Sequence, residues 1–254
     1  MFVKKWFDNS KPIIVAGDSH TYGQGHDEGI FDPFKNPPST KAWPNYIWST
    51  DQFNNIASSG NSNGDITQSI YEHWHDNVKI VCVMFTHFNR RDFTFNGDSY
   101  TFLPSGIQYI SNSVLEHERK KNIHANKTEL FADFQKMFTL QQSDVGDYLN
   151  FLKNVIAIQN LCTSNQCKFF WCTLENIKKS KILTNNPYTD WQISRLEKLV
   201  HWQNYFTIKN NSLTEYAETI PGNVSTACGH YTVEVHKLWG SHFQTFINTI
   251  NETI

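Results

Sequence analysis

The stretch PIIVAGDSH, residues 12–20, decides the fold. Its first part, Pro12 to Ala16, is a continuous apolar run, which is typical of a strand covered on both faces. Its second part, Gly17 to His20, is a tight polar turn that holds the Ser19 hydroxyl clear of the backbone at the end of the strand. Open α/β sheets bind and transform ligands at the carboxyl edge of their strands. The stretch therefore predicts a buried strand with a candidate nucleophile, Ser19, at its carboxyl end.

Three further apolar runs rich in β-forming residues come later in the chain, at Phe53–Ala57, Val78–Thr86 and Lys168–Leu174. Helical patterns separate these runs or flank them. The predicted helices are Trp43–Thr50, Asp65–His75, Thr128–Thr139, Val145–Cys162, Asp190–Tyr205 and Val233–Ile250. Strands that alternate with helices predict a three-layer α/β/α fold around a central parallel sheet.

The whole chain, residues 1–254, is predicted to form a single domain, because no stretch has the composition of a linker. Two segments do not fit the alternating pattern. Gly25–Thr40 is rich in Asp, Pro and Gly and is expected to be a loop beside the first helix. Phe93–Asn126 follows the third strand and is expected to form a lid or an inserted hairpin over the site.

Composition lowers the expectation of several function classes. Charged residues make up 18% of the chain and the net charge is -2, without the basic stripe of a nucleic-acid-binding protein. The N-terminus lacks the apolar core of a signal peptide, and no later apolar run is long enough to span a membrane. These features predict a soluble, cytoplasmic protein that binds neither nucleic acid nor membrane.

The five cysteines indicate neither a disulfide framework nor a zinc site. Their number is odd and none of them is spaced as CxxC. Cys82 and Cys172 lie in apolar strand-like runs and are most simply explained as small buried hydrophobic residues. We therefore expect the protein to need no metal or organic cofactor.

A serine nucleophile needs an exposed turn, a base within hydrogen-bonding distance, and donors directed at the developing oxyanion. Ser19 satisfies the first requirement, although Asp18 and Ser19 would equally serve as ordinary helix caps. Gly60 follows the second strand and can bring its backbone N–H close to a substrate oxygen; alternatively, this segment is only a helix entry capped by Asn63 or Asp65.

The third and fourth clusters supply the remaining candidates. Asn89 follows the third strand, where its amide would serve the same oxyanion or merely hold the loop together. His87 and Arg90 beside it are candidates for lining the pocket. His230 precedes the last helix and is the candidate base, although a lone histidine is more often a surface or core residue. His236, on that helix, has a spacing that suits packing.

The order of these clusters resembles the SGNH/GDSL hydrolase superfamily. The segment GDSHTYGQG at residues 17–25, the Trp-Pro at 43–44, and His230 with His236 and Trp239 resemble a subgroup often met in phages and bacteria. The resemblance implies a flavodoxin-like fold in which Ser19 is the nucleophile and His230 the general base. It also implies that the amides of Ser19 and Gly60 and the side chain of Asn89 bind the oxyanion.

The chain departs from the family pattern at the residue that should orient the base. The family carries an aspartate two or three residues before the histidine, whereas this chain has Ala227 and Cys228. A histidine without an orienting carboxylate can adopt the wrong tautomer, which costs about 10⁴ in turnover in a serine protease. A backbone carbonyl or Glu234 is a candidate substitute. Asp18 is a further candidate supporting residue.

The sequence thus predicts a serine esterase or deacetylase that hydrolyses small acyl esters, with O-acetylated glycans preferred by family analogy. The main alternative is a catalytically degenerate binding or virion-associated structural protein, which the missing aspartate motivates. A third reading is a lipid-directed thioesterase or lipase, whose activity would rise with acyl chain length. The sequence leaves the oligomeric state open.

Overall fold

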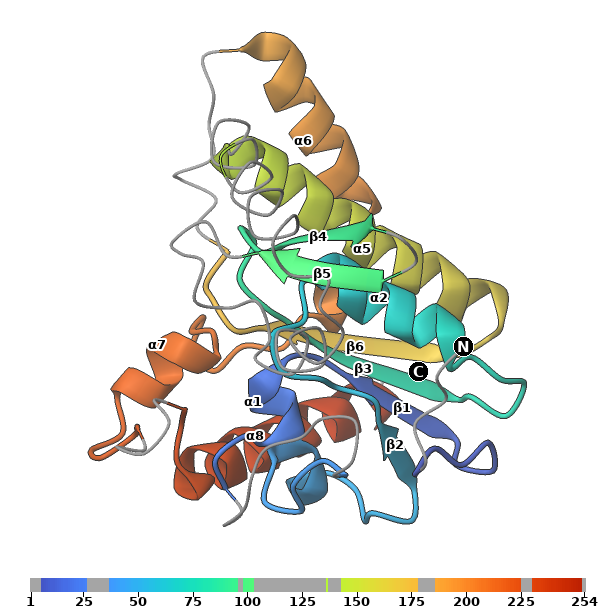
Figure 1. The fold of residues 1–254 in the computed structure, drawn as a ribbon, viewed down its shortest axis with the longest axis vertical. Coiled ribbons are helices and arrows are strands. Elements are labelled where there is room, and N and C mark those ends of the chain that lie inside the picture. The colour runs from blue at the N-terminus through green and yellow to red at the C-terminus, as the bar shows by residue number, and fades with distance from the viewer. Residues whose placement is uncertain are drawn as a thin grey trace, which may run out of the picture.

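The computed structural model describes residues 6–26, 37–95, 98–102, 136, 143–177, 186–224 and 230–252. In these residues the central sheet has four parallel strands in the order β2-β1-β3-β6 (Figure 1). The strands are β1 Ile13–Ala16, β2 Phe53–Asn55, β3 Ile80–Phe85 and β6 Lys168–Thr173. All four predicted strands are present, which confirms the predicted α/β fold with a parallel sheet.

The strand order reverses between β1 and β3. Taken in chain order, the four strands are arranged 2-1-3-4, and an isolated parallel bridge between Trp171 and Tyr205 adds a further position beside β6. This is the flavodoxin-like order, in which ligands bind outside the carboxyl ends of the strands where the order reverses. That point lies between β1 and β3, and Ser19 follows β1.

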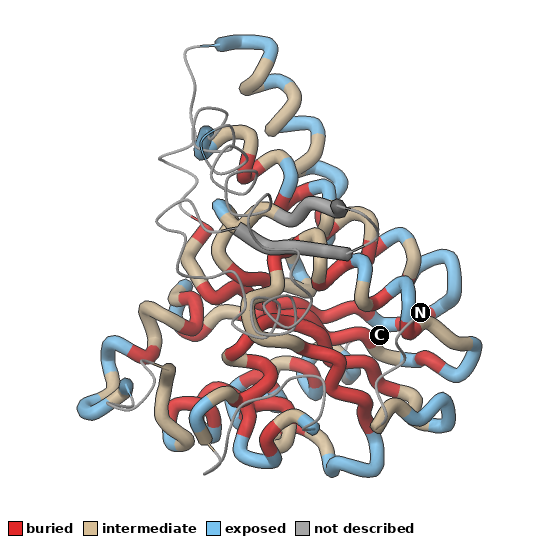
Figure 2. Tube along the Cα trace, viewed as in Figure 1, coloured by how far each residue is buried: buried red, intermediate tan, exposed pale blue. Residues whose placement is uncertain are grey.

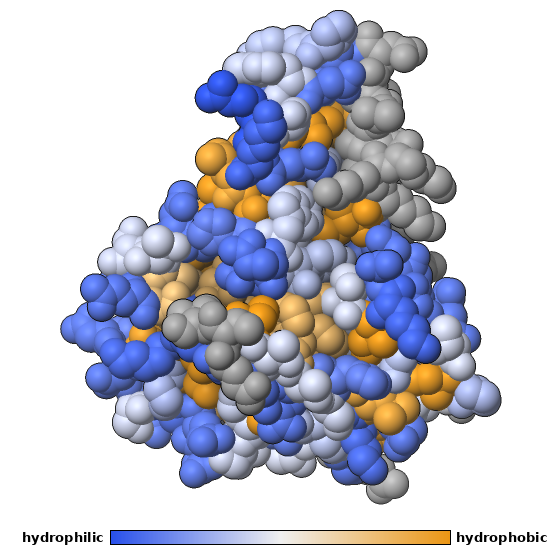
Figure 3. Space-filling view, turned by 180° about the vertical axis from the view of Figure 1, so that it is seen from behind, coloured by the Kyte–Doolittle hydropathy of each residue, from blue (hydrophilic) through white to orange (hydrophobic). Residues whose placement is uncertain are grey.

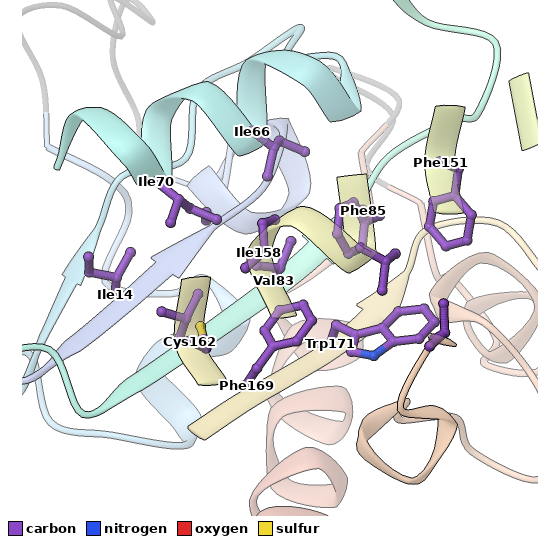
Figure 4. Packing of buried hydrophobic residues seen from close by; sticks show 14 of the residues in the cluster. Ile14, Ile66, Ile70, Val83, Phe85, Phe151, Ile158, Cys162, Phe169 and Trp171 are labelled. Carbon is purple, nitrogen blue, oxygen red and sulfur yellow. The ribbon is translucent and has the colours of Figure 1, made fainter. Parts of the chain in front are cut away.

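One face of the sheet is covered by α2, Asn63–Glu72, and α5, Asp144–Ser164 (Figure 1). Alternate strand residues point to this face, as the two-residue period of a strand requires. Figure 4 shows Ile66 and Ile70 of α2 and Phe151 and Ile158 of α5 over strand residues such as Val83. The continuous apolar runs in the sequence are therefore explained by burial on both faces.

The opposite face is covered by α8, Val233–Glu252, and by η1, a 3-10 helix at Trp43–Tyr46. The other set of strand residues, including Val15 and Met84, packs here against Trp239 and Phe243 of α8. Figure 2 shows that buried residues concentrate on the central strands and on the inner sides of the covering helices. The two helical layers and the sheet give the predicted three-layer architecture.

The predicted helices agree with the structure to different extents. The pattern at 65–75 corresponds to α2, the pattern at 145–162 to α5, and the pattern at 233–250 to α8. The prediction for 43–50 is wrong in type and length, because only the short η1 forms. The prediction for 190–205 covers α6, Pro187–Leu199, and η4, Trp202–Asn204. The backbone turns extended at Val200, which separates these two elements.

Two short helices complete the described part of the chain, namely α1, Ser19–Tyr22, and α7, Leu213–Glu218. The sequence analysis missed α7, although Ser212 and Glu215 form a capping box at its start. Apart from Lys136, which is helical, the helix predicted at 128–139 lies outside the described residues. Most of the expected loop at 25–40 lies outside them as well.

The segment predicted as a lid or hairpin starts at Phe93, within the first strand of an antiparallel pair. These are β4, Arg91–Phe95, and β5, Asp98–Phe102, which pair from Arg91 with Phe102 to Phe95 with Asp98. The remainder of 93–126 lies outside the described residues, so its role over the site stays a prediction.

Seen from behind, apolar side chains form separate patches among polar ones (Figure 3). None of the described helices combines the length and apolarity needed to cross a bilayer.

Gly240 of α8 sets how closely this helix approaches η1. A Cβ at this position would lie 2.6 Å from the Trp43 carbonyl oxygen and 2.8 Å from Tyr46 Cβ. We expect Gly240→Ala to lower the free energy of unfolding by about 1–3 kcal/mol, measured by chemical denaturation, because overpacking outweighs the gain in helix propensity. Ser241→Ala, at the next and exposed position, is the matched control. Unchanged stability in Gly240→Ala would contradict this account of the interface.

Candidate active site

The turn after β1 presents Ser19 as the first residue of α1. Gly17 is required in this turn, because a Cβ there would lie 2.1 Å from Thr21 Oγ1. Asp18 caps the helix by accepting a hydrogen bond from the His20 backbone N–H at 3.0 Å. The exposure expected from the sequence is not found, because the Ser19 residue is buried and only 5% exposed. The described residues contain no hydrogen bond from its hydroxyl to a histidine, a contact that often tightens only when substrate binds.

Asp18 is a fully buried carboxylate that ties the β1 and β3 loops together. Its Oδ2 accepts hydrogen bonds from Thr86 Oγ1 at 2.8 Å and from Arg90 Nη1 at 3.3 Å. Burial alone would raise the pKa of Asp18, but the charges of His20 and Arg90 and the hydrogen bonds outweigh it, so the pKa lies below its ordinary value. Because His20 itself is neutral at neutral pH, Arg90 provides the lasting positive charge. Asp18 therefore fixes the Ser19 turn to the loop that follows β3.

The loop after β2 is joined to the same network. Arg90 Nη1 donates to the Asn61 carbonyl oxygen at 3.2 Å, and Asn61 Nδ2 donates to the Gly17 carbonyl oxygen at 3.1 Å. The Asn63 side-chain oxygen accepts from the Thr86 backbone N–H at 2.9 Å. The three loops that follow β1, β2 and β3 are thus locked to one another. Sequence analysis missed Asn61, although its place in a Gly-Asn-Ser-Asn run after a strand was a usable signal.

Gly60 adopts a left-handed backbone conformation, with φ of +81°. No atom lies within 4 Å of the position that a Cβ would occupy. The space beside this backbone is consistent with the predicted approach of a substrate oxygen. The helix that follows is capped by Ser62, which forms a capping box with Asp65, and so neither Asn63 nor Asp65 is the N-cap.

The loop after β3 places its candidate residues differently. Asn89 is exposed and sits in a turn. Arg90 points inward, with 11% of its side chain exposed, toward Asp18. His87 contacts Glu175 through Nδ1 and Oε1. Glu175, which follows β6, is a residue that sequence reasoning did not single out.

His230 lies at the same edge, packed against the residue next to Ser19. The His20 ring is 5.0 Å from the His230 ring and 4.8 Å from the Tyr231 ring, measured between centroids. An antiparallel bridge between Val224 and Tyr231 fixes the segment just before α8. The structure therefore brings His230 to the Ser19 turn through His20, which sequence reasoning missed although it directly follows Ser19.

Two buried histidines near this turn, His20 and His236, have lowered pKa values. Burial lowers the pKa of His20 to about 4, against the opposing effect of the Asp18 carboxylate. Burial also lowers the pKa of His236 well below its ordinary value, with help from His26, His20 and His230. His236 Nδ1 accepts a hydrogen bond from the Trp43 backbone N–H at 3.1 Å. His236 is thus a packing residue of α8, as its spacing suggested.

Glu234 does not join the described contacts of this cluster. It is exposed on the first turn of α8, and its charge, together with burial, raises the pKa values of Tyr46 and Tyr216. Its role in orienting His230 stays a prediction. Among the described residues, no group of three or more His, Cys, Asp or Glu side chains is arranged to hold a metal ion.

No family model and no curated protein matches this chain. Similar solved structures include TesA, with 10% identity, coverage of 92% of this chain and 97% of that chain, and a TM-score of 0.47. An extracellular lipase from Streptomyces rimosus has 12% identity, coverage of 94% and 99%, and a TM-score of 0.42. An acetylxylan esterase from Geobacillus stearothermophilus, solved as a catalytic mutant, has 12% identity, coverage of 92% and 93%, and a TM-score of 0.43. At these sequence identities and TM-scores, the activities of the three proteins are not assigned to this chain.

Proposed function

We propose that this protein is a serine esterase or deacetylase that hydrolyses small acyl esters, with Ser19 as nucleophile and His230 as general base. One observation carries the proposal: the Ser19 turn is fixed at the β1/β3 boundary by the buried Asp18–Arg90 pair, beside the packed rings of His20 and His230. A flavodoxin-like sheet binds ligands at this boundary. A polar turn fixed by a buried ion pair is suited to holding a nucleophile in one orientation.

The proposed reaction proceeds by two acyl transfers. His230 removes the Ser19 proton while Ser19 Oγ attacks the ester carbonyl carbon, and the carbonyl π electrons move onto oxygen. The backbone amides of Ser19 and Gly60 then stabilise this oxyanion, with Asn89 as the third donor predicted from the sequence. The tetrahedral intermediate collapses, and the alcohol leaves with the proton from His230. Water, deprotonated by His230, attacks the acyl-serine, and the second tetrahedral intermediate collapses to release the acid as His230 returns the proton to Ser19 Oγ.

The proposed substrate is a small acyl ester, with O-acetylated glycans preferred. The test is a series of p-nitrophenyl esters from acetate to octanoate, together with an acetylated oligosaccharide whose acetate release is measured. We expect the acetate to be hydrolysed fastest. Activity that rises with chain length would favour a lipid-directed thioesterase or lipase. Glycan binding without acetate release would favour the non-catalytic alternative that the missing aspartate suggests.

A further inference from the structure

His87 and Glu175 form an imidazole–carboxylate pair outside the set of residues used above. His87 Nδ1 contacts Glu175 Oε1. The two residues lie directly beyond neighbouring strands, because Phe85 of β3 is in register with Thr173 of β6 and each side chain follows two residues later. Their side chains are 34% and 42% exposed, so a substrate can reach them. The pair is therefore an accessible feature at the carboxyl edge of the sheet.

The pair lies beside the Ser19 turn. Ala16 of β1 is in register with Val83 of β3, and the hydrogen bond between Asp18 and Thr86 joins the loops two residues beyond Ala16 and three beyond Val83. His87 is the next residue in the β3 loop. Because the strand order is β2-β1-β3, Gly60 and His87 follow the strands on either side of the strand that carries Ser19.

The charges of the pair act on residues of the site. Burial is the main cause of the lowered pKa of His20, and the charge of His87 adds to it; burial is also the main cause of the raised pKa of Tyr231, to which the charge of Glu175 adds. The His20 and Tyr231 rings are 4.8 Å apart. Asp18, His230 and Arg90 also act on the pKa of His20. His87 thus has Glu175 as its carboxylate partner and is one of the charged groups that act on the residue next to Ser19.

The chemistry of the pair suits a donor to an oxyanion. A carboxylate that accepts a hydrogen bond from Nδ1 stabilises the imidazolium form, in which Nε2 also carries a proton. We propose that His87, held by Glu175, donates its Nε2–H to the oxyanion, in the role that the sequence assigned to Asn89. This inference rests on the proposed function. It is favoured because Asn89 is exposed in its turn, whereas His87 is half-buried and fixed by a partner.

Four variants test the donor role with an acetyl ester as substrate. His87→Ala should lower kcat by about 100-fold with little change in KM, since one oxyanion donor is worth about that much. His87→Gln keeps an N–H donor and should recover about 10-fold of that loss. Asn89→Ala compares the two candidate third donors: a loss of about 100-fold in this variant, together with normal kcat in His87→Ala, would assign the role to Asn89 instead. Unfolding of each variant is followed by tryptophan fluorescence, to show that the fold is retained.

The His87→Gln variant separates a donor from a base, because a side-chain amide donates a hydrogen bond but does not take up a proton. Glu175→Gln removes the carboxylate that fixes His87 and should lower kcat with little change in KM. A kcat in His87→Gln as low as in His87→Ala would overturn the proposal, as would normal kcat in His87→Ala. If Ser19→Ala is inactive in the same assay, either result overturns the donor role alone; an inactive wild type would overturn the proposed function as well.

Discussion

Replacing Ser19 by alanine should lower kcat/KM for an acetyl ester by about 10⁴-fold or more. The reason is that, in the proposed mechanism, the Ser19 hydroxyl forms the covalent acyl intermediate, which alanine cannot form. The fold should tolerate the change, since the Ser19 hydroxyl has no histidine partner within the described residues and alanine is compatible with the first position of α1. The measurement is steady-state hydrolysis of p-nitrophenyl acetate.

The matched control is Ser241→Ala, an exposed serine on α8 whose hydroxyl donates a hydrogen bond to the Lys237 carbonyl oxygen. Its kcat/KM should equal that of the wild type. His230→Ala should also lose most of the activity, because the predicted base is removed. A Ser19→Ala protein that still hydrolyses the ester at the wild-type rate would contradict the assignment of the nucleophile.

The largest expected effect on stability comes from Asp18→Asn. This change leaves the buried Arg90 without its charged partner and weakens the bond from Thr86. Breaking a buried ion pair by removing one partner costs about 3–5 kcal/mol, so we expect a loss in that range at neutral pH. Urea denaturation of wild type and variant measures the difference in the free energy of unfolding.

The Asp18–Arg90 pair also predicts how the free energy of unfolding changes at acidic pH. The pKa of Asp18 is lower in the folded protein than in the unfolded chain. The charge of Asp18 therefore makes its full contribution to the free energy of unfolding above the unfolded pKa, and this contribution is lost as the pH falls through the folded pKa. The difference in stability between wild type and Asp18→Asn should therefore shrink below about pH 4. Asp51→Asn, at an exposed position, is the control and should change stability by less than about 0.5 kcal/mol. A difference that does not depend on pH would rule out a charged Asp18 as the cause.

The parallel sheet was predictable because strands buried on both faces have continuous apolar sequences. Ile13 and Val15 face one core, Ile14 and Ala16 face the other, and the strand reads as an unbroken apolar run. The short elements were harder to predict. The apolar pattern from 43 to 50 suggested a helix, but the structure forms only one 3-10 turn there, with Pro44 near its start. Local propensity does not show where such a turn stops.

The candidate site could be read from the sequence only in part, and the roles of its residues stay proposals. Ser19 follows from a strand that ends in a polar turn, which is a local pattern. The pairing of His87 with Glu175 depends on the register of β3 against β6, which joins residues 88 positions apart in the chain. The packing of His20 on His230 depends on the approach of α8 to the turn. Such long-range contacts leave no periodic signal in a single sequence.

The central claim is that Ser19 is an activated nucleophile. Its most direct test is labelling of the wild-type protein with a fluorophosphonate, followed by mass spectrometry of the labelled peptide. Such reagents react with serines that are activated by a base and an oxyanion hole. We predict one label, on Ser19, that is absent from Ser19→Ala and strongly reduced in His230→Ala. Folded wild-type protein that takes up no label, or takes it up at another residue, would contradict the account.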